Sequence, residues 1–496
     1  MSKKILLYNP RSAKWKFRMP MSLMALGASI EGLQDYEIID GNLINDTETE
    51  QVLAKKIQET DVLFLGITVM PGPQLWQTVP LTKSLKAKFP NLKIVWGGYF
   101  TTLHYETVLE SGYVDFVMKG QADFAFPQLV EFFQGKREVS KVTGLSYIEN
   151  GKIIENPATA PTHPDDHKRF PYHKVQMERY LNPTVLGKRT TAFHASVGCP
   201  FTCSFCAIAA VYEGKWIPMS SQKLIEEILF LKKEYQIDSV EFHDNNFFTA
   251  HQRVEEFALG MKNQNITWWG EGRIDTLLEK YPESAWKAMS ENGCKMIFLG
   301  AESGSENVLE LMDKGGTQTP QDCIDLAKMM KGYGIIPEFS FVMGNPVDPD
   351  DDIRQTIELI KKIKKVNPES EIILYTYSPV PYPGTELYDM AVEQGFKYPQ
   401  KLEDWVSDFW LNFDLRKNPM TPWLKPHHID QIRNFEYVLN AYYPTQTYLP
   451  LTDLQKKILR LLGSWRYKFS IYEYPIELRI LMNRVFKYRS PEIEGF

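Results

Sequence analysis

Three cysteines that lie close together in the chain are the residues best suited to unusual chemistry. Cys199, Cys203 and Cys206 form a C-x3-C-x2-C loop directly after a strand expected to end near Ser196. Thiolates are the usual ligands of iron–sulfur clusters, and a short loop can place three of them around one cubane. Three ligands leave one iron free to bind a substrate or cofactor. The spacing therefore predicts a [4Fe–4S] cluster with one open coordination position.

A structural zinc site and a chance grouping of cysteines are the alternatives. A structural zinc ion needs four protein ligands. His194 is the nearest candidate for the fourth, but it lies on the strand before the loop, where tetrahedral closure is awkward. The remaining cysteines, Cys294 and Cys323, fall in a pre-strand and a helical context, and we expect them to be buried packing thiols.

Composition and charge indicate a globular protein with more than one domain. The chain has 496 residues, of which 43% are hydrophobic and 24% charged, and its net charge of −6 gives no general attraction to nucleic acid. The odd cysteine count favours a reducing compartment over a disulfide framework. The N-terminus turns polar at Asn9 and Pro10, too early for a signal peptide, and no long uncharged apolar run follows. We therefore expect a cytoplasmic protein.

Apolar runs and amphipathic stretches alternate along most of the chain, which predicts an α/β architecture with parallel sheets. Ligands of such sheets bind beyond the carboxyl ends of the strands. The glycine fingerprint for dinucleotides and the P-loop are absent. We expect an N-terminal Rossmann-like domain over 1–140, a linker over 141–189, a partial (β/α)6 barrel over 190–396 and a helical C-terminal domain over 397–496.

The cluster loop and the barrel together resemble the radical S-adenosylmethionine (radical SAM) superfamily. The resemblance starts at Gly198–Cys206 and continues through Glu241–Thr249, Gly272–Asp275 and Gly300–Gly304. It implies that S-adenosylmethionine chelates the open iron, that Phe205 lines the adenine, and that Arg273 and Glu302 bind the methionyl carboxylate and the ribose or amine. One electron from the cluster would then give a 5′-deoxyadenosyl radical. A purely structural ion pair between Arg273 and Glu302 is the alternative.

The N-terminal domain resembles the cobalamin-binding domain that precedes many of these enzymes. The D-x-H-x-x-G motif that supplies a histidine to cobalt is missing, so the resemblance implies cobalamin without a protein histidine ligand. Gln121 and Asp123 also depart from the usual Gly-Glu-x-Glu segment. A Rossmann-like domain that has lost its cofactor is the alternative. The residues expected to bind cobalamin are Asn9, Thr68, Val69, Met70, Trp76, Gly97, Gly98, Tyr99, Gly120 and Gln121.

These resemblances imply a cobalamin-dependent radical SAM methyltransferase that acts on a poorly activated carbon or a phosphinate. A cobalamin-containing cyclase or rearrangement enzyme, similar to the anaerobic magnesium-protoporphyrin monomethyl ester cyclases, is the main rival, and a non-catalytic cluster protein is a third possibility. We expect a small-molecule or lipid-like substrate and a low-potential electron donor such as flavodoxin or ferredoxin. Basic and aromatic residues over 456–468 indicate either helices that pack over the barrel and shape the pocket or a peripheral membrane contact through the C-terminal domain. His427 and His428 are expected to point apart on a helix as surface residues.

Overall fold

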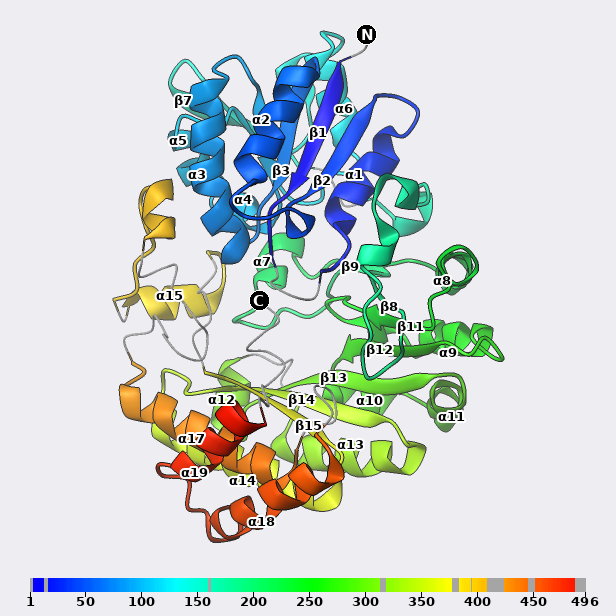
Figure 1. Cartoon of the computed structure of the whole chain (residues 1–496), viewed down its shortest axis with the longest axis vertical. Coiled ribbons are helices and arrows are strands. Elements are labelled where there is room, and N and C mark those ends of the chain that lie inside the picture. The colour runs from blue at the N-terminus through cyan, green and yellow to red at the C-terminus, as the bar shows by residue number, and fades with distance from the viewer. Residues whose placement is uncertain are drawn as a thin grey trace.

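The computed structural model describes residues 3–12, 17–158, 162–312, 318–376, 383–393, 395–407, 423–444 and 451–486. Two α/β units are stacked on each other, with the N-terminal sheet at one end of the molecule and the second sheet below it (Figure 1). Within these described ranges no helix is both long and apolar enough to cross a membrane.

The N-terminal unit is built on one sheet with strand order β2-β1-β3-β4-β5-β6-β7 in the described part of the chain. Strands β1 to β5 are parallel, whereas β6 and β7 are antiparallel additions at one edge. Ile5 and Leu7 pack on one face and Leu6 and Tyr8 on the other, as expected for a strand covered on both sides. The strands are β1 (Lys4–Asn9), β2 (Tyr36–Asp40), β3 (Val62–Thr68), β4 (Ile94–Gly97), β5 (Phe116–Met118), β6 (Leu145–Glu149) and β7 (Lys152–Glu155).

Helices cover both faces of this sheet. Helices α1 and α6 contribute to the core on the face of Ile5 and Leu7, and α2, α3 and α5 to the core on the opposite face. The helices are α1 (Met21–Ile30), α2 (Thr49–Glu59), α3 (Pro73–Lys88), α4 (Tyr99–Leu103), α5 (Tyr105–Glu110) and α6 (Phe126–Phe133). The doubly wound, Rossmann-like arrangement is confirmed.

The expected linker is not a simple connection. Strands β6 and β7 lie inside residues 141–189 and extend the N-terminal sheet to Glu155, well past residue 140. Their hairpin turns at Asn150 and Gly151, both in the left-handed region, which matches the Asn-Gly signal of a tight two-residue turn. The proline-rich remainder forms short 3-10 turns at Pro164–Asp166, Tyr172–Lys174 and Met177–Arg179.

The second unit is an open, parallel six-stranded sheet in the described residues, with strand order β15-β14-β13-β12-β11-β8. Because β8 and β15 lie at opposite edges, the barrel is partial, as the sequence predicts. A small antiparallel ribbon of β9 (Ser196–Gly198) and β10 (Trp216–Pro218) follows β8 and frames α7 (Ala207–Tyr212). The sheet strands are β8 (Thr190–Phe193), β11 (Ser239–Phe242), β12 (Thr267–Gly272), β13 (Cys294–Glu302), β14 (Ile336–Met343) and β15 (Glu371–Thr376).

Most of the helices that pack outside this sheet share one continuous core with it, whereas Val308 and Leu387, from two of them, belong to a small separate cluster. Cys294 and Cys323 are buried in the continuous core and form no disulfide, which confirms their packing role. The helices are α8 (Ser221–Tyr235), α9 (His251–Gly260), α10 (Ile274–Lys280), α11 (Glu283–Glu291), α12 (Glu306–Leu311), α13 (Pro320–Tyr333), α14 (Pro349–Val366) and α15 (Glu386–Glu393).

The C-terminal region divides between the two units. The turn η7 (Leu402–Val406) returns to the N-terminal unit, where Trp405 packs against Phe100 and His104, and Glu403 pairs with Lys83 at 2.9 Å. Helices α17 (Pro426–Tyr442), α18 (Asp453–Phe469) and α19 (Ile476–Ile480), with the π-helical turn η8 (Leu481–Val485), pack on the barrel instead. Residues 397–496 are therefore helical in their latter part but do not form one separate body in the described residues.

Candidate active site

The three cysteines of the loop lie between β9 and α7, and the loop is held on several sides. Gly198 precedes it with φ +74°, and a Cβ there would come within 2.1 Å of the Lys215 carbonyl oxygen on the opposite side of the ribbon. Inside the loop, the Ser204 N–H donates to the Met312 carbonyl at 3.0 Å, and the Ser204 hydroxyl donates to the Leu311 carbonyl at 2.8 Å. The end of α12 therefore fixes the middle of the loop.

A buried carboxylate supports the strand that leads into this loop. Asp244 is fully buried and accepts hydrogen bonds from the Ala195 N–H, at 2.9 Å to Oδ2, and from the Ser196 hydroxyl. Burial raises the pKa of Asp244 to about 6, although the nearby Arg253 favours the charged form. Arg253 in turn donates to the Ala195 carbonyl at 2.9 Å. The hydrogen bonds that Asp244 and Arg253 make to Ala195 and Ser196 thus fix the strand that leads into the cluster loop.

Backbone N–H groups lie near the sulfurs. Those of Phe201 near Cys199 and of Ile208 near Cys206 favour the thiolate forms and so act to lower the pKa of the two thiols. Burial nevertheless raises the pKa of Cys199, and raises that of Cys206 to about 11, so both thiols would keep their protons unless a metal displaced them. Donors around partly buried thiols are the surroundings in which iron–sulfur clusters are bound.

The spacing of the sulfurs fits a cluster better than a single ion. Thiolates on one tetrahedral zinc lie about 4 Å apart, given a Zn–S bond of about 2.3 Å. Within the described residues, the three cysteine sulfurs do not all lie within 4.8 Å of one another. Ligands to three different irons of one cubane need this wider spacing.

Arg273 lies beside the cluster loop in a fixed orientation. Its guanidinium makes a two-pronged ion pair with Asp275, at 3.0 Å from Nε to Oδ1 and 2.6 Å from Nη2 to Oδ2. It also stacks 3.9 Å from the ring centroid of Phe201, and its Nη1 donates to the Cys203 sulfur at 3.4 Å. The carboxylate that holds Arg273 is thus that of Asp275, two residues further along the chain. No role was predicted for Asp275 from the sequence.

Glu302 ends β13 in a strained conformation. It is 7% exposed and has φ +61°, a left-handed value that costs a residue with a Cβ about 1–3 kcal/mol. The following Ser303 donates to Asp352, which also accepts the Gly344 N–H at 2.7 Å, so the turn is anchored to α14. Strain retained at the carboxyl end of a barrel strand is typical of a functional position. Phe205, by contrast, packs in a small apolar cluster with Val308, Met312 and Leu387.

One cavity of about 720 Å³ lies between the two units. On one side it is lined by the carboxyl ends of β1, β3, β4 and β5, and on the other by residues around the cluster loop. The predicted cobalamin residues on its wall are Asn9, Thr68, Met70, Gly97, Gly98, Tyr99, Gly120 and Gln121. The facing residues from the barrel unit include Ser196, Val197, Gly198, Ile208, Val211 and Tyr212.

Two of the predicted cobalamin residues are not on this wall. Val69 is fully buried, and its backbone bonds Gly97 and Phe100, so it ties two strand ends together. Trp76 lies on α3 outside the cavity lining. Neither of them lines this cavity, whereas Thr68 and Met70 do.

Glycine is required where the N-terminal wall is tightest. Gly98 has φ +97°, and a Cβ there would come within 2.9 Å of the Val69 backbone and 3.0 Å of the Thr68 hydroxyl. The Gln121 side-chain oxygen is buried and has no hydrogen-bond partner among the described residues. An open apolar and glycine-lined surface with an unsatisfied acceptor fits a large flat ligand that brings its own donors.

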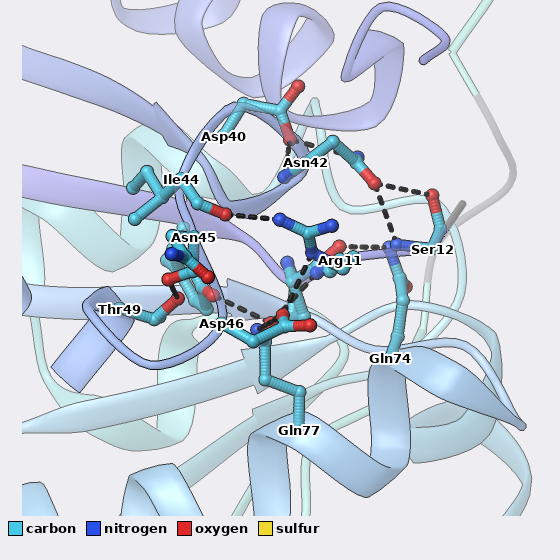
Figure 2. A network of polar contacts seen from close by, with 12 residues as sticks. Arg11, Ser12, Asp40, Asn42, Ile44, Asn45, Asp46, Thr49, Gln74 and Gln77 are labelled. Carbon is cyan, nitrogen blue, oxygen red and sulfur yellow. Dashed lines mark hydrogen bonds and ion pairs between the residues drawn. The ribbon is translucent and has the colours of Figure 1, made fainter. Parts of the chain in front are cut away.

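A polar network behind this wall aligns the loops after β1, β2 and β3. Gln74 donates to Asn9 at 3.1 Å and accepts the Met70 N–H at 3.0 Å, and Asn9 donates to Asp40 at 2.9 Å. Figure 2 shows how the network continues outward through Asn42 and Ser12 to Arg11, whose Nε lies 2.8 Å from Asp46. Gln74 lines the cavity and was missed in the sequence, because a lone glutamine on a helix carries no signal.

His427 and His428 do not point apart as expected. Their ring centroids are 4.0 Å apart, and both Nε2 atoms face Asp350, at 3.6 and 3.2 Å. The Lys425 N–H donates to His428 Nδ1 at 3.1 Å, so a neutral His428 carries its proton on Nε2. To bind a metal together with Asp350, His428 would need a free lone pair on Nε2. We therefore interpret His427, His428 and Asp350 as a helix cap with an acidic neighbour.

Comparison with known proteins agrees with both halves of the site. Residues 194–360 match the Radical SAM superfamily and residues 19–130 the B12 binding domain. An uncharacterized methyltransferase, PH0819, from Pyrococcus horikoshii is 31% identical over 75% of this chain and 78% of its own length. The chain belongs to the cobalamin-binding radical SAM enzymes.

Two further similarities place the chain within this family. An anaerobic magnesium-protoporphyrin IX monomethyl ester cyclase from Synechocystis is 24% identical over 76% of this chain and 73% of its own. The solved structure of the cobalamin-dependent S-adenosylmethionine radical enzyme OxsB, at 15% identity, superposes with a TM-score of 0.70 over 97% of this chain and 74% of that one. The cofactors of this family are a [4Fe–4S] cluster, S-adenosylmethionine and cobalamin, and the donor set and the cavity fit them.

A polar wall inside the barrel was not anticipated. His243 lies between Glu241, at 3.2 Å from Nε2, and Glu271, at 3.7 Å from Nδ1, and the Trp269 indole donates to Glu338 at 2.9 Å. Burial lowers the pKa of His243, but the hydrogen bonds to the two glutamates outweigh it and raise the pKa overall. Val240 and Phe242 on the same strand are fully buried. The alternation of apolar and polar residues along β11 could therefore have predicted that Glu241 and His243 share the opposite face of the sheet.

His194 connects this wall to the cavity. It lines the cavity, and its ring centroid is 6.2 Å from that of His243. Enclosure of the ring between the two units, and then the charges of His243 and Arg18, lower the pKa of His194 below its ordinary value, although the side chain is open to the cavity. His194 therefore favours its neutral form, in which one ring nitrogen can donate and the other accept a hydrogen bond.

Proposed function

We propose that this chain is a cobalamin-dependent radical SAM methyltransferase that methylates a poorly activated carbon or a phosphinate. The observation that carries the proposal is a cavity lined on one side by the glycine-rich sheet edge and on the other by residues that flank the cluster loop, Ser196–Gly198 and Ile208. Methyl transfer needs the methyl carrier and the radical generator to act on one substrate, and one shared cavity meets that requirement. The relative from Pyrococcus horikoshii, which carries the name of a methyltransferase, supports it.

In this proposal the chain's own residues bind and orient the reactants. Cys199, Cys203 and Cys206 hold the cluster, and the Asp244–Arg253 pair keeps their loop in place. Arg273 and Glu302 bind the polar ends of S-adenosylmethionine, and Phe205 contacts its adenine. When bound, the cluster and S-adenosylmethionine supply a carbon-centred radical, and cobalamin supplies the methyl group. Asn9, Thr68, Met70, Gly97, Gly98, Tyr99, Gly120 and Gln121 form the cobalamin wall.

The polar barrel wall would orient the substrate. His243 is held by two carboxylates, so it can present a fixed N–H or charge, while neutral His194 can accept or donate a single hydrogen bond. The turn at Leu402–Val406 contacts the N-terminal unit through Trp405. This contact would help to keep the two cofactor walls in a fixed relative position and to exclude water from the site. We infer a small-molecule or lipid-like substrate, with flavodoxin or ferredoxin as the electron donor.

The test uses the full chain, reconstituted anaerobically with iron, sulfide and cobalamin. Incubation with methyl-deuterated S-adenosylmethionine, a low-potential reductant and small-molecule extracts of the source cells should yield S-adenosylhomocysteine, 5′-deoxyadenosine and a deuteromethyl-labelled product together. If deoxyadenosine forms and no metabolite gains label, the methyltransferase assignment is wrong.

A radical cyclase is the second candidate, because cyclases of the same domain order are among the relatives. The two reactions share the cofactors and differ in what happens to the substrate carbon. A cyclase would consume S-adenosylmethionine to deoxyadenosine, remove hydrogen from the substrate and leave the methyl label in recovered methionine. The same labelling experiment therefore separates them.

A further inference from the structure

The outward face of α18 is an apolar stripe that nothing in the described structure covers. Leu461 is 75% exposed, Phe469 74% and Leu454 68%. The spacing of the exposed apolar residues follows the helical repeat, so they share one face of the helix about 100° wide. The stripe consists of Leu454, Ile458, Leu461, Leu462, Trp465 and Phe469.

The opposite face of α18 is fixed in place, so the stripe cannot turn inward. Leu459 and Tyr467 are buried, and a Cβ on Gly463 would come within 2.9 Å of the Ala441 Cβ on α17. Arg466, 8% exposed, is ion-paired with Glu477. Close packing on one side and the ion pair made by the buried Arg466 leave the apolar side exposed as a stable feature of the fold.

Cations border the stripe along one edge. Lys457 and Lys468 are exposed and lie next to it on the helical wheel. Lys457 and Lys468 have no carboxylate partner among the described residues, and the only acidic residue of the helix is Asp453 at its start. This edge is basic although the chain as a whole carries a net charge of −6.

The apolar surface continues beyond α18. More than half of the large apolar side chains that are exposed in the described residues lie between Leu454 and Val485, and they include Ile476 and Ile480 on α19. Single exposed apolar residues are common, but a contiguous group of this kind marks an interaction surface.

We propose that α18 lies on the surface of an anionic lipid bilayer, with the stripe in the interface and the basic edge at the headgroups. A tryptophan and a phenylalanine among aliphatic residues, bordered by lysines, are the composition of an interfacial helix. A second copy of the chain is the less suitable occupant, because stripe-to-stripe contact would bring two sets of uncompensated cations together. The contact is peripheral, since no described helix is long and apolar enough to span the bilayer.

The experiment is flotation of the full, cluster-reconstituted chain with liposomes of phosphatidylcholine alone or with one third phosphatidylglycerol. The wild type should float with the anionic vesicles and stay at the bottom with the neutral ones. The double variant L461E/F469E should bind at least about 100-fold more weakly, given the transfer energy of two large apolar side chains. K457Q/K468Q should bind about 25-fold more weakly, or about fivefold for each charge removed.

The matched control is Leu259→Glu on α9, which removes an apolar side chain that is 54% exposed and stands alone. It should float as the wild type does. The proposal is wrong if the wild type does not float with anionic vesicles or if L461E/F469E floats as well as the wild type. It is also wrong if the wild type is a dimer that does not bind vesicles and L461E/F469E only converts this dimer to a monomer. Cleavage of S-adenosylmethionine should be unchanged in all variants, so failure of the proposed enzymatic function would be seen separately.

Discussion

The two walls of the cavity recognise their ligands in different ways. The N-terminal wall is a row of strand ends in which Gly98 is needed for space. On the barrel side three thiols lie in the loop between Gly198 and Ile208, which line the cavity, and ionisable groups that are almost completely buried, such as Arg273 and Asp244, support this loop. The first wall selects a ligand by shape and the second by bonds. The two should therefore fail independently when they are mutated.

Cys203→Ala should have the largest effect and should be confined to the barrel wall. Loss of one thiolate leaves the cubane with two protein ligands, so iron and sulfide content and reductive cleavage of S-adenosylmethionine should fall to background. Corrinoid content of the same sample should remain at the wild-type level. Cys323→Ala, a buried core thiol, is the control and should keep the cluster. Loss of cobalamin together with the cluster would show that the walls are coupled.

Gly98→Ala should break the other wall. The new methyl group would press on the Val69 backbone at 2.9 Å, in a left-handed conformation that itself costs about 1–3 kcal/mol. We expect at least about a tenfold loss of bound corrinoid with iron content unchanged, measured on one anaerobic preparation. Gly32→Ala is the matched control, because Gly32 has φ +80° and nothing within 4 Å of its Cβ position. Equal loss in both variants would mean that backbone strain, and not the space at Gly98, matters.

This difference also explains what the sequence could reveal. The cysteine loop was predictable because three ligands of one type at fixed spacing have few other uses. The sheet and barrel followed from alternating strands and helices, and the glycine pairs indicated the cobalamin edge. The contacts of Gln74 with Asn9 and of His243 with Glu271 were not predictable, because they depend on which strands become neighbours. The Arg273–Asp275 and His243–Glu241 contacts join residues only two positions apart, and they were missed because charged residues at this spacing are common and do not by themselves indicate a contact. The antiparallel β6 and β7 were missed because they follow the parallel strands and lie within a stretch interpreted as a linker.

Arg273→Lys should sharpen the picture of the barrel wall. A lysine cannot make the two-pronged contact to Asp275 or stack on Phe201, although it keeps the charge. Losing charge-assisted hydrogen bonds of about 1.5–3 kcal/mol should raise the KM for S-adenosylmethionine by about 10- to 100-fold. Iron content should stay at the wild-type level. Arg354→Lys, at an exposed pair on α14, should change neither quantity. An unchanged KM in Arg273→Lys would remove Arg273 from cofactor binding.

Asp244→Asn should give the smallest effect, a change in how stability depends on pH. The pKa of Asp244 is about 6 in the fold, and that of an unfolded aspartate is about 3.9. Between these values the folded chain binds the extra proton, so this group stabilises the fold as pH falls and the benefit is lost as pH rises through 6. The free energy of unfolding of the wild type should therefore gain about 1 kcal/mol from this group between pH 7 and pH 5. Asparagine does not titrate, so the difference in the free energy of unfolding between wild type and variant should shift by that amount in urea unfolding of the cluster-free protein.

Asp238→Asn is the control. Hydrogen bonds from backbone N–H groups lower the pKa of Asp238 despite burial, so Asp238 stays charged from pH 5 to 7. The difference in the free energy of unfolding between wild type and Asp238→Asn should therefore be the same at both pH values. A constant difference for Asp244→Asn as well would mean that the carboxylate beneath the cluster loop is charged throughout, and the barrel wall would then carry one more buried charge than proposed.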